Sequence, residues 1–341
     1  MNKKNVTIRQ IFTSTLSCEP IVRRTANGEL LCICECDGPG EPHPDNRVYA
    51  FHSKDNGVTW SAKKSIYPED GQAVCCTEVM INGDEITAYI AVHTGYFLDW
   101  KCYMMKSFDN GYTWKNQGTV PHFPEYALVR SAIVLRNGSI VLPYQFYPVT
   151  REEHDRILRE ETRKHPESHT QTEYCESGVL ISKDGGKTFE RRAACRMNMR
   201  DRDAEYKWIW SEPTIVEAED NHIIMLMRAD GTKALWRCDS YDAGETWSEY
   251  YKTDIINPTN KPKLIALDRG RIALIHTPST TARYPLEMWI SDDHMKTWSE
   301  KRQLTDFPGS YNYSDGFYED GHILFTVEHN RHTILLFDVE L

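Results

Sequence analysis

Short apolar or alternating runs fill most of the chain, and turn residues separate them. Residues 30–36 (LLCICEC) precede 47–53 (RVYAFHS), and residues 222–229 (HIIMLMRA) precede 233–240 (KALWRCDS). Runs of this length divided by Asn-Gly, Asp-Gly or Arg-Gly pairs are typical of β-strands. Helical periodicity is weak except in the charged stretch 151–169, REEHDRILREETRKHPESH. The pattern therefore predicts an all-β protein with one inserted helix or loop, either a solvated excursion or a flap over the active face.

One phrase with the frame S-x-D-x-G-x-T-W recurs along the chain. Its five copies are SKDNGVTW (53–60), SFDNGYTW (107–114), SKDGGKTF (182–189), SYDAGETW (240–247) and SDDHMKTW (291–298). The third copy ends in Phe189, and the fifth has Met295 at the glycine position. Because successive copies start 54, 75, 58 and 51 residues apart, they have the period of β-propeller blades.

The residue types in the phrase explain why it recurs. An aspartate can accept backbone N–H bonds within its own turn, and glycine readily takes a positive φ. We expect the final aromatic residue to anchor each turn, so that each copy fixes a hairpin between two strands of one blade. Five marked blades and one unmarked blade predict a six-bladed β-propeller of four-stranded antiparallel blades. It would form a single domain over residues 1–341, with an insertion at about 150–170 and with strand 5–12 closing the ring against 332–341.

The composition narrows the possible partners. The chain of 341 residues is 40% hydrophobic and 26% charged, as in a soluble globular protein, and its net charge is −10. This charge argues against nucleic acid as the main partner, which requires a basic surface. No apolar run approaches the roughly 20 residues of a membrane-spanning helix. The N-terminus has a basic start but no continuous apolar segment, so we expect no secretory signal and a cytoplasmic location.

Cysteine and histidine usage gives no clear basis for a cofactor. The ten cysteines include Cys32, Cys34 and Cys36 alternating along one predicted strand, where neighbours are poorly placed to form disulfides. A zinc site there is an alternative, but no CxxC pair supports it, and we expect buried, reduced thiols. The thirteen histidines form no HxH or HExxH pair. We therefore predict no metal or organic cofactor, with structural calcium left open.

The repeated phrase is identified as the Asp-box, or BNR repeat, and the chain resembles the sialidase superfamily. The box also occurs in non-catalytic proteins, so it indicates fold rather than chemistry. The resemblance implies a retaining mechanism in which a tyrosine attacks the anomeric carbon and a glutamate takes its proton. It also implies an aspartate as acid/base and three arginines around the substrate carboxylate, an exception to the two-carboxylate rule.

Three segments carry the resemblance beyond the boxes. Residues 311–330 (YNYSDGFYEDGHILFTVEHN) place Tyr313 as nucleophile and Glu328 at a supporting acidic position, although Tyr313 could be merely a strand aromatic. Residues 210–247 place Glu212 as the base and Arg228 in the carboxylate clamp, with an ion pair to Asp230 as the competing interpretation of Arg228. Residues 277–293 place Arg283 in the clamp, where a guanidinium fork suits a planar carboxylate.

The first arginine of the family clamp is absent. Where the family has Arg-Ile-Pro, this chain has Cys18-Glu19-Pro20. Glu19 would repel a carboxylate and could instead accept sugar hydroxyls. Arg23 or Arg24 would compensate only after a strand shift, and Arg130 is another candidate. The substrate is therefore expected to differ from ordinary sialic acid.

The acid/base is expected in the loop 37–47 (DGPGEPHPDNR) of the first blade. Asp45, eight residues before the first box, is the first choice and Asp37 the second. His43 could instead share in proton transfer.

These assignments predict a retaining exo-glycosidase that removes a terminal acidic sugar from a glycan or oligosaccharide. An exo-arabinanase-like enzyme using Glu19, Glu212 and Asp45, or a polysaccharide lyase using His43, His93 or His276, is an enzymatic alternative. A carbohydrate- or protein-binding propeller is the non-enzymatic one. Tyr313 and Glu212 distinguish the classes, because only the glycosidase requires the two to meet near the ring axis.

Overall fold

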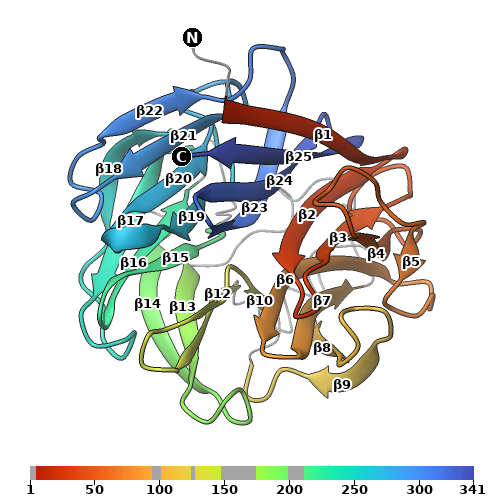
Figure 1. Cartoon of the computed structure of the whole chain (residues 1–341). Helices are drawn as coiled ribbons and strands as arrows, with labels where there is room; N and C mark the ends of the chain where they lie inside the picture. Colours follow the sequence, from red (N-terminus) through yellow and green to blue (C-terminus); the bar gives the residue numbers. More distant parts are fainter. Residues whose placement is uncertain (1–4, 94–100, 124–126, 147–173, 199–210, 230) are drawn as a thin grey trace, which may run out of the picture.

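The protein is an all-β propeller of six blades, and the insertion near 150–170 falls outside its described residues. The computed structural model describes residues 5–93, 101–123, 127–146, 174–198, 211–229 and 231–341. Antiparallel sheets stand around a central axis, which confirms the predicted fold class (Figure 1). From the innermost strand outward, the first blade has β2 (Ser17–Arg24), β3 (Leu30–Cys36), β4 (Arg47–Ser53) and β5 (Lys64–Ser65), and the second has β6 (Ala73–Asn82), β7 (Glu85–His93), β8 (Lys101–Ser107) and β9 (Lys115–Thr119). The third has β10 (Ala127–Val129) with β11 (Ile133–Val134), then β12 (Ile140–Phe146), β13 (Tyr174–Ser182) and β14 (Glu190–Asn198), and the fourth has β15 (Thr214–Glu219), β16 (His222–Arg228), β17 (Ala234–Ser240) and β18 (Tyr251–Ile256). The fifth has β19 (Lys263–Ala266), β20 (Ile272–His276), β21 (Glu287–Ser291) and β22 (Glu300–Gln303), and the sixth has β23 (Tyr311–Glu319), β24 (His322–His329), β25 (Thr333–Glu340) and β1 (Val6–Thr13).

The two ends of the chain close the ring within the sixth blade. Strand β1 pairs antiparallel with β25, from Val6 opposite Val339 to Thr13 opposite Thr333. This is the closure that the sequence predicts, and it covers the edge that β25 would otherwise expose.

Each Asp-box forms the connection between the third and fourth strand of its blade. In the second box, Asp109 accepts hydrogen bonds from the Thr113 backbone N–H at 2.8 Å and from the Thr113 hydroxyl at 2.6 Å. Ser107 donates to Asp109 at 2.8 Å and accepts the Gly111 N–H at 2.9 Å. The glycine position has a positive φ in every copy, including Met295 at 64°. The predicted turn chemistry is thus confirmed, and the sixth blade is the unmarked one.

The cores lie within and between neighbouring blades. One cluster joins Val179 and Ile181 of β13 to Ile223 and Met225 of β16. All ten cysteines are buried, as expected for structural thiols, and none forms a disulfide in this structure. The described part of the chain contains no helix with the length and apolar character that crossing a bilayer requires.

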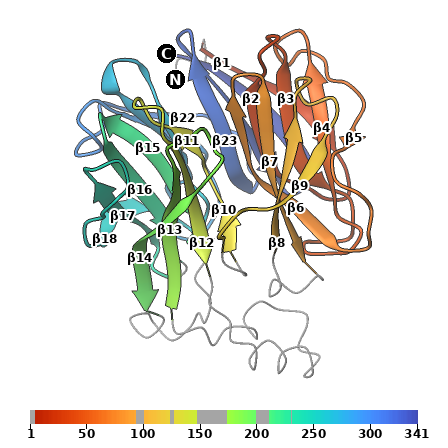
Figure 2. The same ribbon diagram turned by 90° about the horizontal axis from the view of Figure 1, so that it is seen from below.

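The strand register shows that the boxes lie at one end of the ring and that the innermost strands begin at the opposite end. In the first blade, Leu30 pairs with Ser53 at the end that carries the box. Ser17, at the start of β2, instead pairs with Cys36 at the end of β3. Innermost strands therefore begin, and second strands finish, at the end of the ring away from the boxes (Figure 2).

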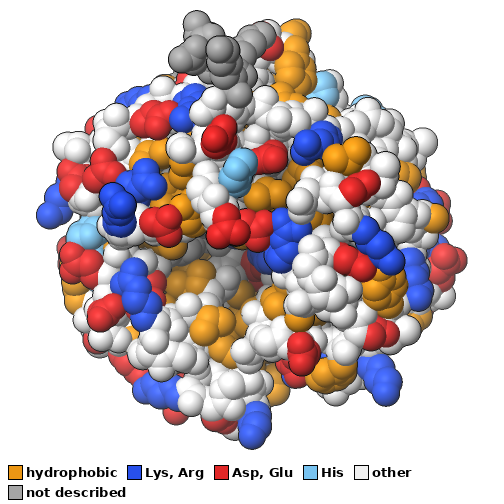
Figure 3. Space-filling model, in the orientation of Figure 1, with side chains coloured by type: hydrophobic (Ala, Val, Ile, Leu, Met, Phe, Trp, Pro, Cys, Tyr) orange, Lys and Arg blue, Asp and Glu red, His pale blue; other side chains and the backbone are white. Residues whose placement is uncertain are grey.

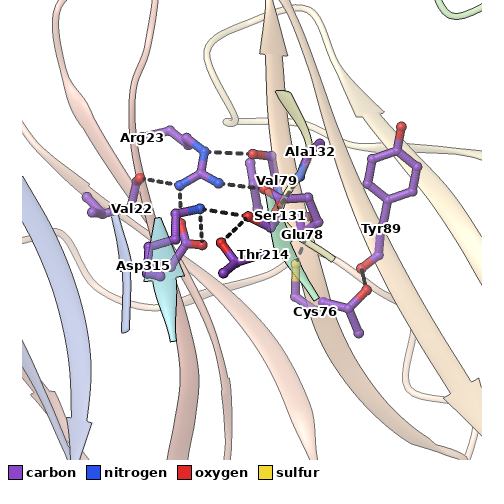
Figure 4. Close-up of polar contacts among 12 residues, drawn as sticks. Val22, Arg23, Cys76, Glu78, Val79, Tyr89, Ser131, Ala132, Thr214 and Asp315 are labelled. Carbon is purple, nitrogen blue, oxygen red and sulfur yellow. Dashed lines mark hydrogen bonds and ion pairs between the residues drawn. The ribbon is translucent and has the colours of Figure 1, made fainter. Parts of the chain in front are cut away.

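A polar network at the hub connects all six blades. Arg23 of β2 forms ion pairs with Glu78 of β6 and Asp315 of β23 (Figure 4). Lys263 donates to the second Asp315 oxygen at 2.8 Å. Glu78 also accepts the Ala132 N–H at 2.9 Å, and the Ser131 and Thr214 hydroxyls lie 3.0 Å apart. These charges are paired with one another, as buried charges must be. On the surface in the orientation of Figure 1, acidic and basic side chains are interspersed around a central hollow (Figure 3).

Candidate active site

Four residues with strained backbones stand where innermost strands begin. Glu19, Ser131, Glu212 and Tyr313 have φ angles of 46°, 47°, 25° and 52°. The ladders of β2 and β23 are also irregular here, between Cys18 and Ile21 and between Asn312 and Asp315. Left-handed conformations of such residues carry an energetic cost and cluster at functional sites, where bulges re-aim side chains. The local structure therefore marks this end of the hub as a candidate site.

Tyr313 and Glu212 meet there, as the sequence predicts for a glycosidase. The Tyr313 hydroxyl donates to Glu212 Oε1 at 3.0 Å, although the two residues are 101 positions apart in the chain. Arg228, at the end of β16, donates to Glu212 Oε2 at 2.6 Å. Asp230, the alternative partner of Arg228, lies outside the described residues. Glu212 is buried, and Tyr313 is partly exposed.

The surroundings give this pair opposite pKa shifts. Burial acts to raise the pKa of Glu212, but the nearby charges of Arg228, Arg130 and Lys261 outweigh it and lower the pKa of that carboxyl. Burial, reinforced by the Glu212 charge, raises the pKa of Tyr313. At neutral pH the pair is therefore a carboxylate accepting a hydrogen bond from a phenol, which is the arrangement of a base and its nucleophile.

Arg283 also reaches this cluster, and its hydrogen bonds go to uncharged groups. It donates to Asn312 Oδ1 at 2.6 Å and to the Thr259 carbonyl at 3.1 Å. Burial and the neighbouring Arg228 charge lower its pKa. Two guanidinium groups close enough to disfavour each other's charge are an arrangement that an anion between them would stabilise.

Glu19 and Arg130 form a buried ion pair beside Tyr313. Arg130 donates to Glu19 Oε2 at 2.6 Å and lies 3.5 Å from Glu212 Oε1. Its guanidinium carbon is 6.0 Å from the centre of the Tyr313 ring. The Glu19 N–H donates to Glu328 Oε2 at 3.1 Å, so Glu328 supports the strained segment. Arg130 thus reaches the site, but its charge is balanced by the glutamate that stands beside the missing arginine.

Arg23 and Arg24 are engaged elsewhere and do not compensate for that arginine. Arg23 belongs to the hub network with Asp315 and Glu78, and Arg24 forms an ion pair with Glu319. In the β2–β3 ladder, Arg23 and Arg24 pair with Leu31 and Leu30, toward the end of the ring that carries the boxes.

The 37–47 loop brings a glutamate, rather than the preferred aspartate, toward the cluster. The Asp45 side chain is 70% exposed and lies 3.4 Å from His43. Asp37 accepts from Tyr49 and Lys63. Glu41 is only 11% exposed and pairs with Arg331.

Of the acidic residues in this loop, Glu41 is the one that interacts electrostatically with the site. The charge of Glu41 contributes to raising the pKa values of Tyr313, Glu19 and Glu328. Sequence reasoning did not select Glu41, because the loop offers several acidic residues and its Gly-Pro composition does not indicate which one turns inward.

One group of potential metal ligands occurs among the described residues. Ligand atoms of Cys18, Glu35 and Glu41 lie within 4.8 Å of one another. Arg331 pairs with Glu41, and burial raises the pKa of Glu35, so with Glu35 protonated the cluster is neutral without a cation.

Comparisons with known proteins agree with this geometry. Residues 72–324 match the model of the BNR repeat-like domain family. The chain belongs to this family. Over 340 residues this chain is 25% identical to a sialidase of Paraclostridium sordellii, and the match covers 88% of this chain and 76% of the relative. A sialidase of Bacteroides fragilis (strain YCH46) is 24% identical over 233 residues, which cover 62% of this chain and 36% of the relative.

Solved structures show the same fold. The Hadza microbial sialidase Hz136 superposes with a TM-score of 0.74 at 18% identity, covering 96% of this chain and 66% of that one. The NanB sialidase of Streptococcus pneumoniae gives a TM-score of 0.70 at 14% identity, covering 98% of this chain and 70% of that one. The curated relatives and these structures are sialidases, and the chain spans only part of their length.

Proposed function

We propose that the protein is a retaining exo-glycosidase that removes a terminal acidic sugar from a glycan or oligosaccharide, with Tyr313 as nucleophile. The contact of the Tyr313 hydroxyl with Glu212 at 3.0 Å, beside Arg228 and Arg283, carries the proposal. A binding platform would not require a buried carboxylate aimed at a partly accessible phenol. The sialidase relatives point to glycans as the substrate class.

In the first step, Glu212 accepts the phenolic proton while the Tyr313 oxygen bonds to the anomeric carbon. The glycosidic bond breaks, and an acid protonates the departing oxygen. In the second step, water attacks the same carbon from the side that the leaving group vacated, and the conjugate base of the acid accepts a proton from this water. Tyr313 departs and recovers its proton from Glu212. Two inversions give net retention of configuration.

A neutral nucleophile suits an anionic substrate. A carboxylate nucleophile would repel the acidic sugar, whereas the phenol becomes charged only as its proton moves to Glu212. Arg228 holds Glu212 in place at 2.6 Å and favours its ionised form.

We assign the acid/base role to Glu41 in preference to Asp45. Glu41 belongs to the loop in which the family carries this residue, is largely buried, and is electrostatically coupled to Tyr313. Arg331 fixes its position. Asp45 is exposed to solvent and interacts with His43.

The test is hydrolysis of a panel of aryl glycosides of sialic, uronic and neutral sugars, with the product anomer followed by NMR. Wild-type protein should release an acidic sugar with retained configuration. Tyr313→Phe should lower kcat by about 1,000-fold with little change in KM, because the interaction it removes forms in the transition state. Tyr318→Phe is the matched control, since Tyr318 lies on the same strand and its hydroxyl contacts Asp268.

Two outcomes would overturn the proposal. One is a wild-type protein that hydrolyses none of the glycosides. The other is a Tyr313→Phe variant as active as Tyr318→Phe. An unsaturated product would instead identify a lyase.

A further inference from the structure

Not every cation of the candidate site forms an ion pair among the described residues. Arg130 is paired with Glu19, and Arg228 with Glu212. Arg283 donates to neutral oxygens of Asn312 and Thr259. Lys261 is a further cation beside Tyr313, and no sequence motif indicated a role for it.

Lys261 is a buried lysine without a hydrogen-bonding partner for its side chain in the described part of the chain. The residue is only 4% exposed, and its Nζ lies 5.9 Å from the centre of the Tyr313 ring. Lys263, two positions along, shows the usual solution: its Nζ donates to Asp315 at 2.8 Å and to Ser131 at 3.4 Å. The two lysines therefore differ in kind, one neutralised within the hub network and one left against the ring of the nucleophile.

Leaving an ammonium in this position is costly. Burial removes much of the hydration of the ammonium, and the Tyr313 ring and the charges of Asp315 and Glu19 compensate for this loss only in part. Burial and the neighbouring Arg130 charge accordingly lower the pKa of Lys261. An anion bound next to Lys261 would remove that cost. Anion binding therefore explains the buried lysine, whereas packing alone does not.

The segment that carries Lys261 also holds Arg283. The Thr259 carbonyl accepts from Arg283 at 3.1 Å, and Lys261 follows two residues later. Lys261 also senses the charge of Glu19, next to the position where the family clamp has its first arginine. Residues 259–261 thus contact Arg283 of the clamp and place Lys261 near Glu19, beside the position of the missing arginine.

We propose that Lys261 is a substrate-binding residue that, together with Arg283, receives the anionic group of the sugar and supplies the positive charge that Cys18-Glu19-Pro20 lacks. The ligand class is a sugar carboxylate. This inference rests on the glycosidase proposed above and adds a specificity determinant to it. Because an ammonium is a compact point charge rather than a planar fork, it neutralises the anion without imposing bidentate geometry.

Isothermal titration calorimetry of sugar acids against their methyl esters tests the inference without requiring turnover. Suitable ligands are 2-deoxy-2,3-dehydro-N-acetylneuraminic acid and glucuronic acid, each compared with its ester. Wild-type protein should bind at least one acid at least tenfold more tightly than its ester. Lys261→Met should weaken binding of that acid about 10- to 100-fold and leave the ester unaffected.

Two further variants provide controls. Lys106→Met removes a lysine that pairs with Glu85, away from the site, and should bind like wild type. Lys261→Arg keeps the charge and should retain the preference for the acid. The wild-type affinity should fall as alkaline pH removes the lysine proton, whereas the Lys261→Arg affinity should not, since a guanidinium stays charged.

The inference is overturned if no acid binds, if acid and ester bind equally, or if Lys261→Met binds the acid like wild type. Its failure is separable from that of the proposed function. Release of an acidic sugar that Tyr313→Phe abolishes, with Lys261→Met binding the acid like wild type, would contradict the lysine assignment alone. Carboxylate binding that depends on Lys261, with Tyr313→Phe fully active, would contradict the nucleophile alone.

Discussion

At the scale of single residues, the candidate site combines strained backbone with buried charge. Glu212 has a φ of 25° and is fixed by contacts to Tyr313 and Arg228. Each feature costs stability, and the surrounding blades hold both in place. This combination is typical of a site whose geometry was selected for chemistry rather than for packing.

Glu41→Gln and Asp45→Asn distinguish the two acids of the first-blade loop. Glu41→Gln should lower kcat for a glycoside with a poor leaving group by about 100-fold or more, because general-acid catalysis is worth about 10²–10⁴-fold. The loss should be smaller for an aryl glycoside whose leaving group needs little protonation. Asp45→Asn should behave as wild type on both. Kinetic comparison of the two leaving groups is the measurement, and the reverse pattern would restore Asp45 as the acid.

Glu328 provides a pH-dependent stability test. Burial raises its pKa to about 7, and its Oε1 has no hydrogen-bond partner among the described residues. The folded protein therefore holds a proton there that the unfolded chain releases above about pH 4.5. The stability that this proton provides is complete at lower pH and is lost as the pH rises from about 4.5 through 7.

Glu328→Gln should accordingly stabilise the fold at pH 8 by up to about 3 kcal/mol and change little at pH 5, because one pKa unit corresponds to about 1.4 kcal/mol. Urea unfolding at the two pH values measures the difference. Equal effects at both would mean that Glu328 titrates normally. The glutamine oxygen can still accept the Glu19 N–H, so the segment should keep its conformation.

Sequence motifs identified part of the site and missed the rest for a physical reason. Tyr313, Glu212, Arg228 and Arg283 lie in segments with recognisable spacing, and the structure brings all four together. Lys261 has no such motif, and a lysine in a polar segment is normally exposed. Its burial arises only when the fifth blade meets its neighbours, so it could be found only in three dimensions.

At the scale of elements, the Asp-box turns are local and self-sufficient. Asp109 makes its contacts with Ser107 and Thr113, within one turn. Short-range chemistry of this kind can be read from sequence, which is why the boxes and their blades were predicted correctly. The third blade's innermost strand is divided into β10 and β11, which both pair with β12 on either side of Arg130, and this division was not predicted.

Asp109→Ala should therefore cost stability and spare activity. Loss of the turn contacts should lower the free energy of unfolding by about 1–2 kcal/mol. Phe108→Ala is the matched control, since Phe108 belongs to the same turn and is 62% exposed. Denaturant unfolding and glycosidase kinetics are both required. A large loss of kcat in Asp109→Ala would show that the box influences the site at the far end of the blade.

At the scale of the whole molecule, two devices hold the ring together. The hub network runs from Arg23 through Asp315 and Glu78 to the remaining blades (Figure 4). The β1–β25 pairing joins the first strand of the chain to the last. The pairing was predictable from the two terminal apolar runs, whereas the network was not, because its members are scattered through the sequence.

Removal of the first 13 residues should expose the edge of β25 and lower the thermal unfolding temperature, with aggregation detectable by light scattering. Adding a synthetic peptide of residues 5–13 should restore the unfolding temperature, because it can re-form the pairing in trans. An unchanged unfolding temperature in the truncated protein would mean that the ring does not depend on this closure.

The central claim is that Tyr313 forms a bond with the anomeric carbon. Its most direct test is peptide mass spectrometry after incubation with fluorinated inactivators that trap glycosyl-enzyme intermediates, using 2,3-difluorosialic acid and 2-deoxy-2-fluoro uronyl fluorides. We predict a single adduct on the peptide that contains Tyr313, absent from Tyr313→Phe. An adduct on Glu19, Glu41 or Glu212, or inactivation of the protein without any covalent adduct, would contradict the account.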